Sequence, residues 1–152
     1  MNHKISSIRH VGMVVRDLNT SLKFYNEILG LSIYRRVLEK PGKFIDDLVR
    51  IKNVQLEWVK LVIPAGGLIE LIQYHSSPDS DLAVKPEPLA SDRLGCSHVA
   101  LTVKDLSKLY NELISNGYLC NSEPLISPEG KAKILYCHDP DGIILELIED
   151  LS

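Results

Sequence analysis

The chain has 152 residues, a formal net charge of −3, and ordinary fractions of hydrophobic (45%) and charged (24%) residues. This length suits one domain with its own hydrophobic core, so we expect a single domain over residues 1–152. The acidic balance gives no electrostatic reason to expect a nucleic acid or an anionic membrane as partner.

In the first half, β-branched and alternating residues predict strands, and capping residues bound a helix. The predicted strands cover residues 8–15, 31–38, 54–63 and 68–74. Asp17 is the expected N-cap of a helix over residues 18–29, and Gly30 is expected to end it. The apolar stripe of that helix is expected to comprise Leu22, Tyr25 and Leu29. Residues 44–49 fit a short helical segment. The first module, residues 5–75, is thus predicted as β-α-β-β-β.

Residues 76–94 form a polar connector that contains Pro78, Pro86 and Pro88, which favours a plain linker over a flap above a site. The second module, residues 95–150, is predicted to repeat the order of the first. Asp105 is the expected cap of a helix that runs to about residue 116, and Gly117 ends it. The predicted strands cover residues 96–103, 118–123 (a weak one), 131–138 and 143–148.

An internal repeat underlies this duplication. The segment His10-Val11-Gly12-Met13-Val14-Val15-Arg16-Asp17-Leu18 has the same pattern as His98-Val99-Ala100-Leu101-Thr102-Val103-Lys104-Asp105-Leu106. Downstream, Leu68-Ile69-Glu70-Leu71-Ile72 matches Ile144-Leu145-Glu146-Leu147-Ile148, and each has a glycine four residues before its glutamate. Two histidines and two glutamates therefore stand at equivalent places in the two modules.

We interpret these four residues as candidate ligands of one divalent metal ion. Strand alternation puts each histidine on one face with a small residue two places later (Gly12 and Ala100), which leaves room beside a metal. The glutamates lie among Leu and Ile, where a bare charge is too costly unless it has a partner or a metal. A site built from His10, Glu70, His98 and Glu146 has borderline ligands that suit Ni, Co, Zn, Mn or Fe.

The remaining candidates favour structural roles. His3 lies near the N-terminus, His75 is expected on the opposite face from Glu70, and His138 abuts a turn where a solvated role is expected. We interpret the basic residues Arg35, Arg36, Lys40 and Lys43 as a solvated rim rather than an anion site. Large apolar side chains are by default expected in the core, and this applies to Phe44, Ile45, Leu48, Trp58 and Tyr74.

The glycine spacings fit neither a P-loop nor a dinucleotide fingerprint, and no arrangement supports Ser-His-Asp hydrolysis. Cys96, Cys120 and Cys137 form no C-x-x-C pair, which favours reduced, mostly buried thiols. With no signal-peptide pattern and no run long enough to cross a bilayer, we expect a cytoplasmic protein.

These residues resemble the vicinal oxygen chelate superfamily, which includes glyoxalase I, methylmalonyl-CoA epimerase, extradiol dioxygenases and bleomycin and fosfomycin resistance proteins. The motifs that carry the resemblance are His10-Val11-Gly12, Phe24-Tyr25 with Leu29-Gly30-Leu31, Gly66-Gly67-Leu68-Ile69-Glu70-Leu71, His98-Val99-Ala100, and Asp139-Pro140-Asp141-Gly142 with Leu145-Glu146-Leu147. The resemblance implies an α+β fold, with two βαβββ modules whose eight strands make an open, curved mixed sheet around a cup. It also implies metal ligands from the first and last strands of each module, which are again His10, Glu70, His98 and Glu146.

By similarity to glyoxalase I, Glu146 and Glu70 are the expected catalytic bases of a lyase or isomerase that shuttles a proton beside a carbonyl. The expected substrate is a small carbonyl compound or thioester, and a homodimer is expected because many relatives are dimeric. Glyoxalase I typically has a basic residue where this chain has Glu27, which argues against glutathione as the thiol. The alternatives are an Fe(II) extradiol-type dioxygenase and a metal-free drug-binding resistance protein.

Overall fold

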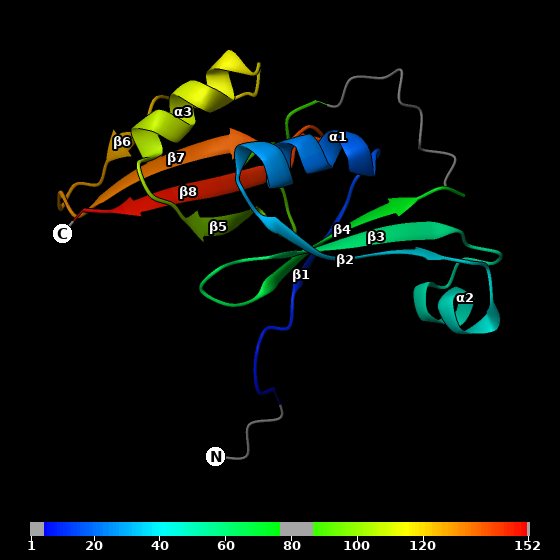
Figure 1. Cartoon of the computed structure of the whole chain (residues 1–152). Helices are drawn as coiled ribbons and strands as arrows, with labels where there is room; N and C mark the ends of the chain where they lie inside the picture. Colours follow the sequence, from blue (N-terminus) through cyan, green and yellow to red (C-terminus); the bar gives the residue numbers. More distant parts are fainter. Residues whose placement is uncertain (1–4, 77–86, 152) are drawn as a thin grey trace. The chain divides into compact units, whose positions relative to one another are not determined.

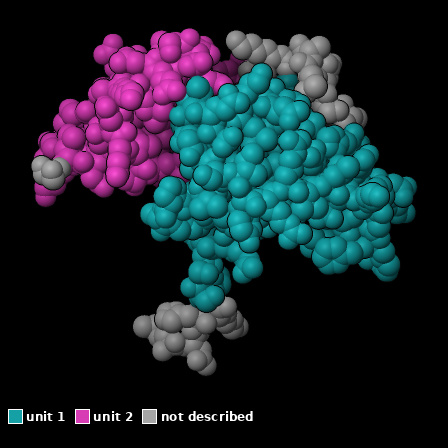
Figure 2. All heavy atoms as spheres, viewed as in Figure 1, with its two compact units in different colours: residues 1–84 teal, residues 85–152 magenta. Residues whose placement is uncertain are grey.

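The computed structural model describes residues 5–76 and 87–151. The chain divides into two compact units, Met1–Val84 and Lys85–Ser152, which Figure 2 shows in separate colours. Each unit is built around one four-stranded mixed sheet. The described residues contain no helix long and apolar enough to cross a membrane.

The described residues of the first unit form four strands and three helical segments (Figure 1). In chain order they are β1 (Val11–Val14), α1 (Leu18–Leu22), η1 (Lys23–Ile28), β2 (Ser32–Glu39), α2 (Lys43–Val49), β3 (Leu56–Val62) and β4 (Leu68–Tyr74). The strand order across the sheet is β1-β4-β3-β2. The first and last strands of the unit are therefore neighbours, and they run parallel.

The helix of the first unit begins as expected, because the Asp17 carboxylate accepts a hydrogen bond from the Thr20 backbone N–H at 2.7 Å. It continues as the π-helix η1, whose wider turns place both Phe24 and Tyr25 in the core. Of the predicted stripe, Tyr25 is fully buried and Leu22 and Leu29 are half-buried, whereas the burial of Phe24 is not predicted by an α-helical period. Gly30 follows with the left-handed backbone that a helix end needs (φ 72°).

In the part of the second unit that the structure describes, there are four strands and one helix. In chain order they are β5 (His98–Thr102), α3 (Leu106–Ser115), β6 (Leu125–Ile126), β7 (Ala132–His138) and β8 (Ile144–Asp150). The strand order is β5-β8-β7-β6, and β5 runs parallel to β8, as β1 does to β4. The two units thus share one topology, and the predicted α+β fold of two βαβββ modules is confirmed, with the eight strands divided between two sheets.

Packing of the helices against the sheets buries the apolar strand faces. In the first unit the fully buried side chains include Val59, Leu61, Ile69 and Leu71, together with Leu18, Phe24 and Tyr25 of the helix. In the second unit they include Leu135, Leu145 and Leu147, with Leu106 and Leu113 of α3. The Glu149 carboxylate accepts hydrogen bonds from the Asp105 and Leu106 backbone N–H groups, which joins the start of α3 to β8.

Three local expectations are wrong. Residues 118–123 form no strand beyond a single bridge between Cys120 and Cys137, and the short strand lies later, at β6. Phe44 and Leu48 are 80% and 66% exposed, because α2 projects from the end of β2 rather than packing into the core. Cys96 is exposed, whereas burial raises the pKa of Cys120 to about 11 and that of Cys137 to about 12.

The predicted connector, residues 76–94, falls partly outside the described residues, which resume at Glu87. From there the chain packs on the turn before β8. The Leu89 backbone N–H donates to the Gly142 carbonyl at 3.0 Å. A Cβ atom on Gly142 would lie only 2.6 Å from the Glu87 carbonyl oxygen, and the backbone there is left-handed (φ 82°). This part of the predicted linker is thus attached to the second unit, and a glycine is required beneath it.

Candidate metal-binding pairs

In the first unit, the structure brings His10 and Glu70 together. His10 directly precedes β1, and parallel pairing of β1 with β4 sets Gly12 opposite Glu70. His10 Nε2 lies 3.2 Å from Glu70 Oε2, and the glutamate side chain is only 13% exposed. A Cβ atom on Gly12 would lie 3.9 Å from the same oxygen, so a longer side chain there would cover the carboxylate. The expectation that a small residue here leaves room beside a metal stays a prediction.

The second oxygen of Glu70 is held by a lysine from the neighbouring strand. Lys60 lies opposite Glu70 in the β3–β4 ladder, and its Nζ is 3.2 Å from Glu70 Oε1. The same ammonium lies 4.7 Å from the centre of the Trp58 ring, and the Arg35 guanidinium lies 5.6 Å from it. The carboxylate of Glu70 is therefore shared between an imidazole and an ammonium.

In the second unit, His98 and Glu146 repeat this arrangement. His98 is the first residue of β5, and β5 pairs with β8 so that Ala100 lies opposite Glu146. His98 Nε2 lies 3.2 Å from Glu146 Oε2, the same atoms and distance as in the first pair. One imidazole nitrogen and one carboxylate oxygen thus face each other in each unit.

The surroundings of the two histidines differ. His98 Nδ1 lies 3.2 Å from Ser97 Oγ and 3.4 Å from the Tyr136 hydroxyl, and the rings of His98 and Tyr136 are 5.1 Å apart. Burial and, secondarily, the charge of Glu146 raise the pKa of Tyr136, so its hydroxyl stays protonated. His10 Nδ1, in contrast, is buried without a hydrogen-bonding partner among the described residues.

The chemistry of these atoms fits a divalent transition metal, since imidazole nitrogen and carboxylate oxygen are the borderline ligands that such ions accept. Among the described residues, no third His, Cys, Asp or Glu side chain joins His10–Glu70 or His98–Glu146 to make a larger group. The joint site of His10, Glu70, His98 and Glu146 stays a prediction.

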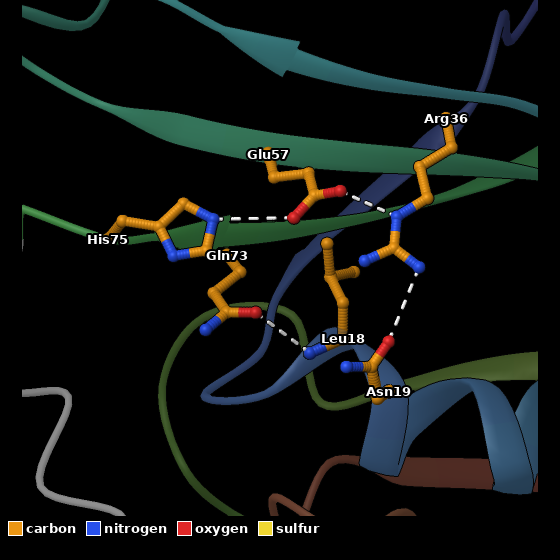
Figure 3. A network of polar contacts seen from close by, with 6 residues as sticks. All are labelled: Leu18, Asn19, Arg36, Glu57, Gln73 and His75. Atoms are coloured by element: carbon orange, nitrogen blue, oxygen red, sulfur yellow. Dashed lines mark hydrogen bonds and ion pairs between the residues drawn. The ribbon is translucent and has the colours of Figure 1, made fainter.

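Of the other histidines, His75 takes part in a polar network at the opposite face of the first sheet (Figure 3). Its Nε2 lies 3.3 Å from Glu57 Oε2, and Arg36 Nε donates to the other Glu57 oxygen at 2.5 Å. Arg36 also reaches the Asn19 side chain of α1, while the Gln73 side chain accepts from the Leu18 backbone N–H at 2.9 Å (Figure 3). The hydrogen bond from Arg36 holds the pKa of Glu57 below its usual value. The network fastens the start of α1 to the sheet.

His138 is not solvated as expected. It is only 4% exposed, its Nε2 lies 2.8 Å from Asn121 Oδ1, and its Nδ1 lies 3.2 Å from the Gly142 carbonyl. It supports the turn before β8, because both ring nitrogens are committed to its neighbours. His3 lies outside the described residues.

The residues of the predicted basic rim have different partners. Arg36 pairs with Glu57, Lys43 pairs with Asp47, and Arg35 lies against Trp58. Sequence reasoning overlooked Lys60, Tyr136 and Ser97. A signal was present for two of them, because Lys60 and Tyr136 each stand ten residues before a predicted glutamate ligand.

Comparisons of this sequence and structure with known proteins all point to glyoxalase-like proteins. Residues 7–147 match the family model described as the Glyoxalase/Bleomycin resistance protein/Dioxygenase superfamily. A probable lactoylglutathione lyase of Synechocystis is 27% identical over 94% of this chain and 95% of its own length. The protein YwbC of Bacillus subtilis is 27% identical over 93% of this chain and 96% of its own. The crystal structure of a glyoxalase family protein from Bacillus cereus has a TM-score of 0.85 at 24% identity, and covers 99% of this chain and 98% of its own.

Proposed function

The chain belongs to the Glyoxalase/Bleomycin resistance protein/Dioxygenase superfamily, and from this we propose that it is a divalent-metal-dependent lyase or isomerase of the glyoxalase type. The observation that carries the proposal is the duplicated pair, with Nε2 and Oε2 3.2 Å apart in both units. An accidental salt bridge has no reason to recur with the same atoms at equivalent register positions.

We assign His10, Glu70, His98 and Glu146 as the ligands that would together hold one cation, from the set Ni, Co, Zn, Mn and Fe. Two imidazoles and two carboxylates balance the charge of a divalent ion. They also leave positions of an octahedron for substrate oxygens. Among the described residues His10 Nδ1 is buried without a hydrogen-bonding partner, and an incompletely satisfied imidazole beside a carboxylate supports this assignment.

When bound, the cation supplies Lewis acidity toward the substrate carbonyl. The chain's own part is to move the proton at the adjacent carbon, for which a carboxylate within reach is suited. Glu146 and Glu70 are the proposed bases, while His10 and His98 hold their positions. Lys60 neutralises one oxygen of Glu70, and the protonated phenol of Tyr136 lies beside the other pair, so the two glutamates work in different settings.

The substrate that we propose is a small carbonyl compound or a thioester. Relatives named lactoylglutathione lyase make a hemithioacetal the leading choice, although Glu27 argues against glutathione as its thiol. The test is metal analysis of the purified protein, followed by assays of the metal-replete protein. The assay panel comprises hemithioacetals of methylglyoxal with neutral, cationic and anionic thiols, and an α-substituted acyl thioester whose epimerisation can be followed. We expect about one divalent ion per site and turnover of one of these compounds, and sedimentation to report a homodimer.

Two experimental outcomes would favour a different function for this protein. Oxygen uptake with Fe(II) and a catechol would favour a dioxygenase, and tight binding of a planar drug by the chelator-treated protein would favour sequestration. Wild-type metal content in both Glu70→Ala and Glu146→Ala would show that the ligand assignment is wrong.

A further inference from the structure

The hydrogen bonds around His98 indicate which of its ring nitrogens carries the proton. Ser97 Oγ donates its proton to the Ser91 carbonyl at 2.9 Å. The same Oγ lies 3.2 Å from His98 Nδ1, where its remaining role is that of an acceptor. Nδ1 is therefore the donor of that contact and carries a hydrogen.

This tautomer has a consequence on the other side of the ring. A neutral imidazole has only one N–H, so a hydrogen on Nδ1 leaves Nε2 with a lone pair. That lone pair faces Glu146 Oε2 at 3.2 Å, and a carboxylate oxygen is also an acceptor. Two acceptors at this distance need a positive charge between them, which either a proton or a metal cation provides.

Once Nδ1 carries the hydrogen, the Tyr136 hydroxyl is a second oxygen that can accept it. The hydroxyl lies 3.4 Å from Nδ1, and the tilted contact of the two rings limits rotation of the imidazole. Because the register sets Tyr136 opposite Glu146, the phenol is fixed by the backbone ladder rather than by a loop. Among the residues that the structure describes, His10 Nδ1 has no equivalent partner, and Lys60 occupies the position that matches Tyr136 and binds the glutamate instead.

We propose that Ser97 and Tyr136 are positioning residues, whose oxygens take the Nδ1 hydrogen of His98 so that Nε2 presents its lone pair, beside Glu146, to a divalent cation. This proposal rests on the proposed function, because it assumes that His98 is a ligand. Groups that orient a ligating histidine in this way typically contribute about 10- to 100-fold to metal affinity.

The first test measures Co(II) binding to chelator-treated protein by its visible absorption and by calorimetry. We expect the double variant Ser97→Ala/Tyr136→Phe to bind Co(II) about 10- to 100-fold more weakly than wild type, with an altered visible spectrum. Ser97→Thr keeps the hydroxyl and should retain wild-type affinity. Tyr110→Phe on α3, with Tyr136 intact, is the matched control. Wild-type affinity in the double variant, together with weakened binding in His98→Ala, would overturn this inference alone.

The second test needs no variant. Long-range proton–nitrogen NMR of the Zn(II)-loaded wild type assigns the ring nitrogens of His98 directly. We expect the hydrogen on Nδ1 and none on Nε2, and the reverse would overturn the proposal even if the double variant failed to fold. If His98→Ala binds Co(II) as well as wild type does, the ligand assignment under the proposed function fails as well.

Discussion

Lys60 and Tyr136 occupy equivalent positions in the two units, each directly opposite the predicted glutamate ligand of its own sheet. One is a cation that holds its glutamate by an ion pair, and the other is a neutral phenol that lies against a histidine. The duplication has thus kept the His–Glu pair and changed the residue beside it, so variants of the two residues test the proposed metal binding of each half separately.

Replacing Lys60 with Met should raise the affinity of the protein for Co(II) about threefold to tenfold. The ammonium competes with a metal for Glu70, and releasing a partly buried ion pair of this kind is worth about 1 kcal/mol. Titration of the chelator-treated variant measures the change. The exposed Lys52, replaced in the same way, is the control for net charge. Weaker Co(II) binding by Lys60→Met would mean that the lysine supports the site rather than competing for it.

Glu146→Ala should lower turnover at least about 100-fold while the protein stays folded, because loss of a general base typically costs that much. Its side chain is partly exposed, so its removal leaves the core intact. Activity on the best compound of the panel and the thermal unfolding midpoint should be measured together. Glu129→Ala, at an exposed turn, should match wild type in both. Retained turnover in Glu146→Ala would exclude this residue as the base.

Gly142→Ala should destabilise the protein more than Gly130→Ala. Both glycines have left-handed backbones (φ 82° and 70°), which cost an alanine about 1 kcal/mol. Only at Gly142 would the new Cβ overlap the Glu87 carbonyl, at 2.6 Å, and such overpacking adds about 1–3 kcal/mol. Urea unfolding of the two variants separates these contributions. Equal losses would show that the segment at Glu87 moves aside freely.

The ion pair between Arg36 and Glu57 should make stability depend on pH in the acid range. The pKa of Glu57 is lowered in the folded state, so the unfolded chain takes up its proton first as the pH falls. The stabilisation is present above the ordinary pKa of 4.5 and is lost as the pH falls through the lowered value.

Glu57→Gln should therefore lower the free energy of unfolding by about 1 kcal/mol at pH 7 and by much less near pH 3. Urea midpoints at the two pH values test this, with the exposed Glu129→Gln as control. A Glu57→Gln effect of the same size at both pH values would contradict the assigned role of Arg36.

The sequence predicts the topology well because a repeat supplies each element twice. The Asp caps, the glycines after the helices and the alternating strands are local signals, and the structure confirms the elements that they bound. The repeat identifies the four residues of the two His–Glu pairs, but their contact depends on long-range parallel pairing of the first and last strands, which the family resemblance implied.

The side-chain contacts that could not be predicted from the sequence are those that depend on strand register and on burial. A bulge in β2 between Ile33 and Arg35 shifts the pairing with β3, and strand alternation alone does not predict that Arg35 lies against Trp58 while Arg36 reaches Glu57. The π-helical turns of η1 likewise change which side chains enter the core. His138 looks like a turn residue in the sequence, yet its burial depends on Asn121, which is distant in the chain.

Parallel pairing of the first and last strands has a consequence for the order of assembly. In each unit the histidine comes early in the sequence and the glutamate comes late, on two strands that pair with each other. The histidine and the glutamate therefore meet only when that unit has folded. A metal bound at this site would therefore stabilise the folded protein by mass action. The early steps of folding would depend on the hydrophobic core and not on the metal.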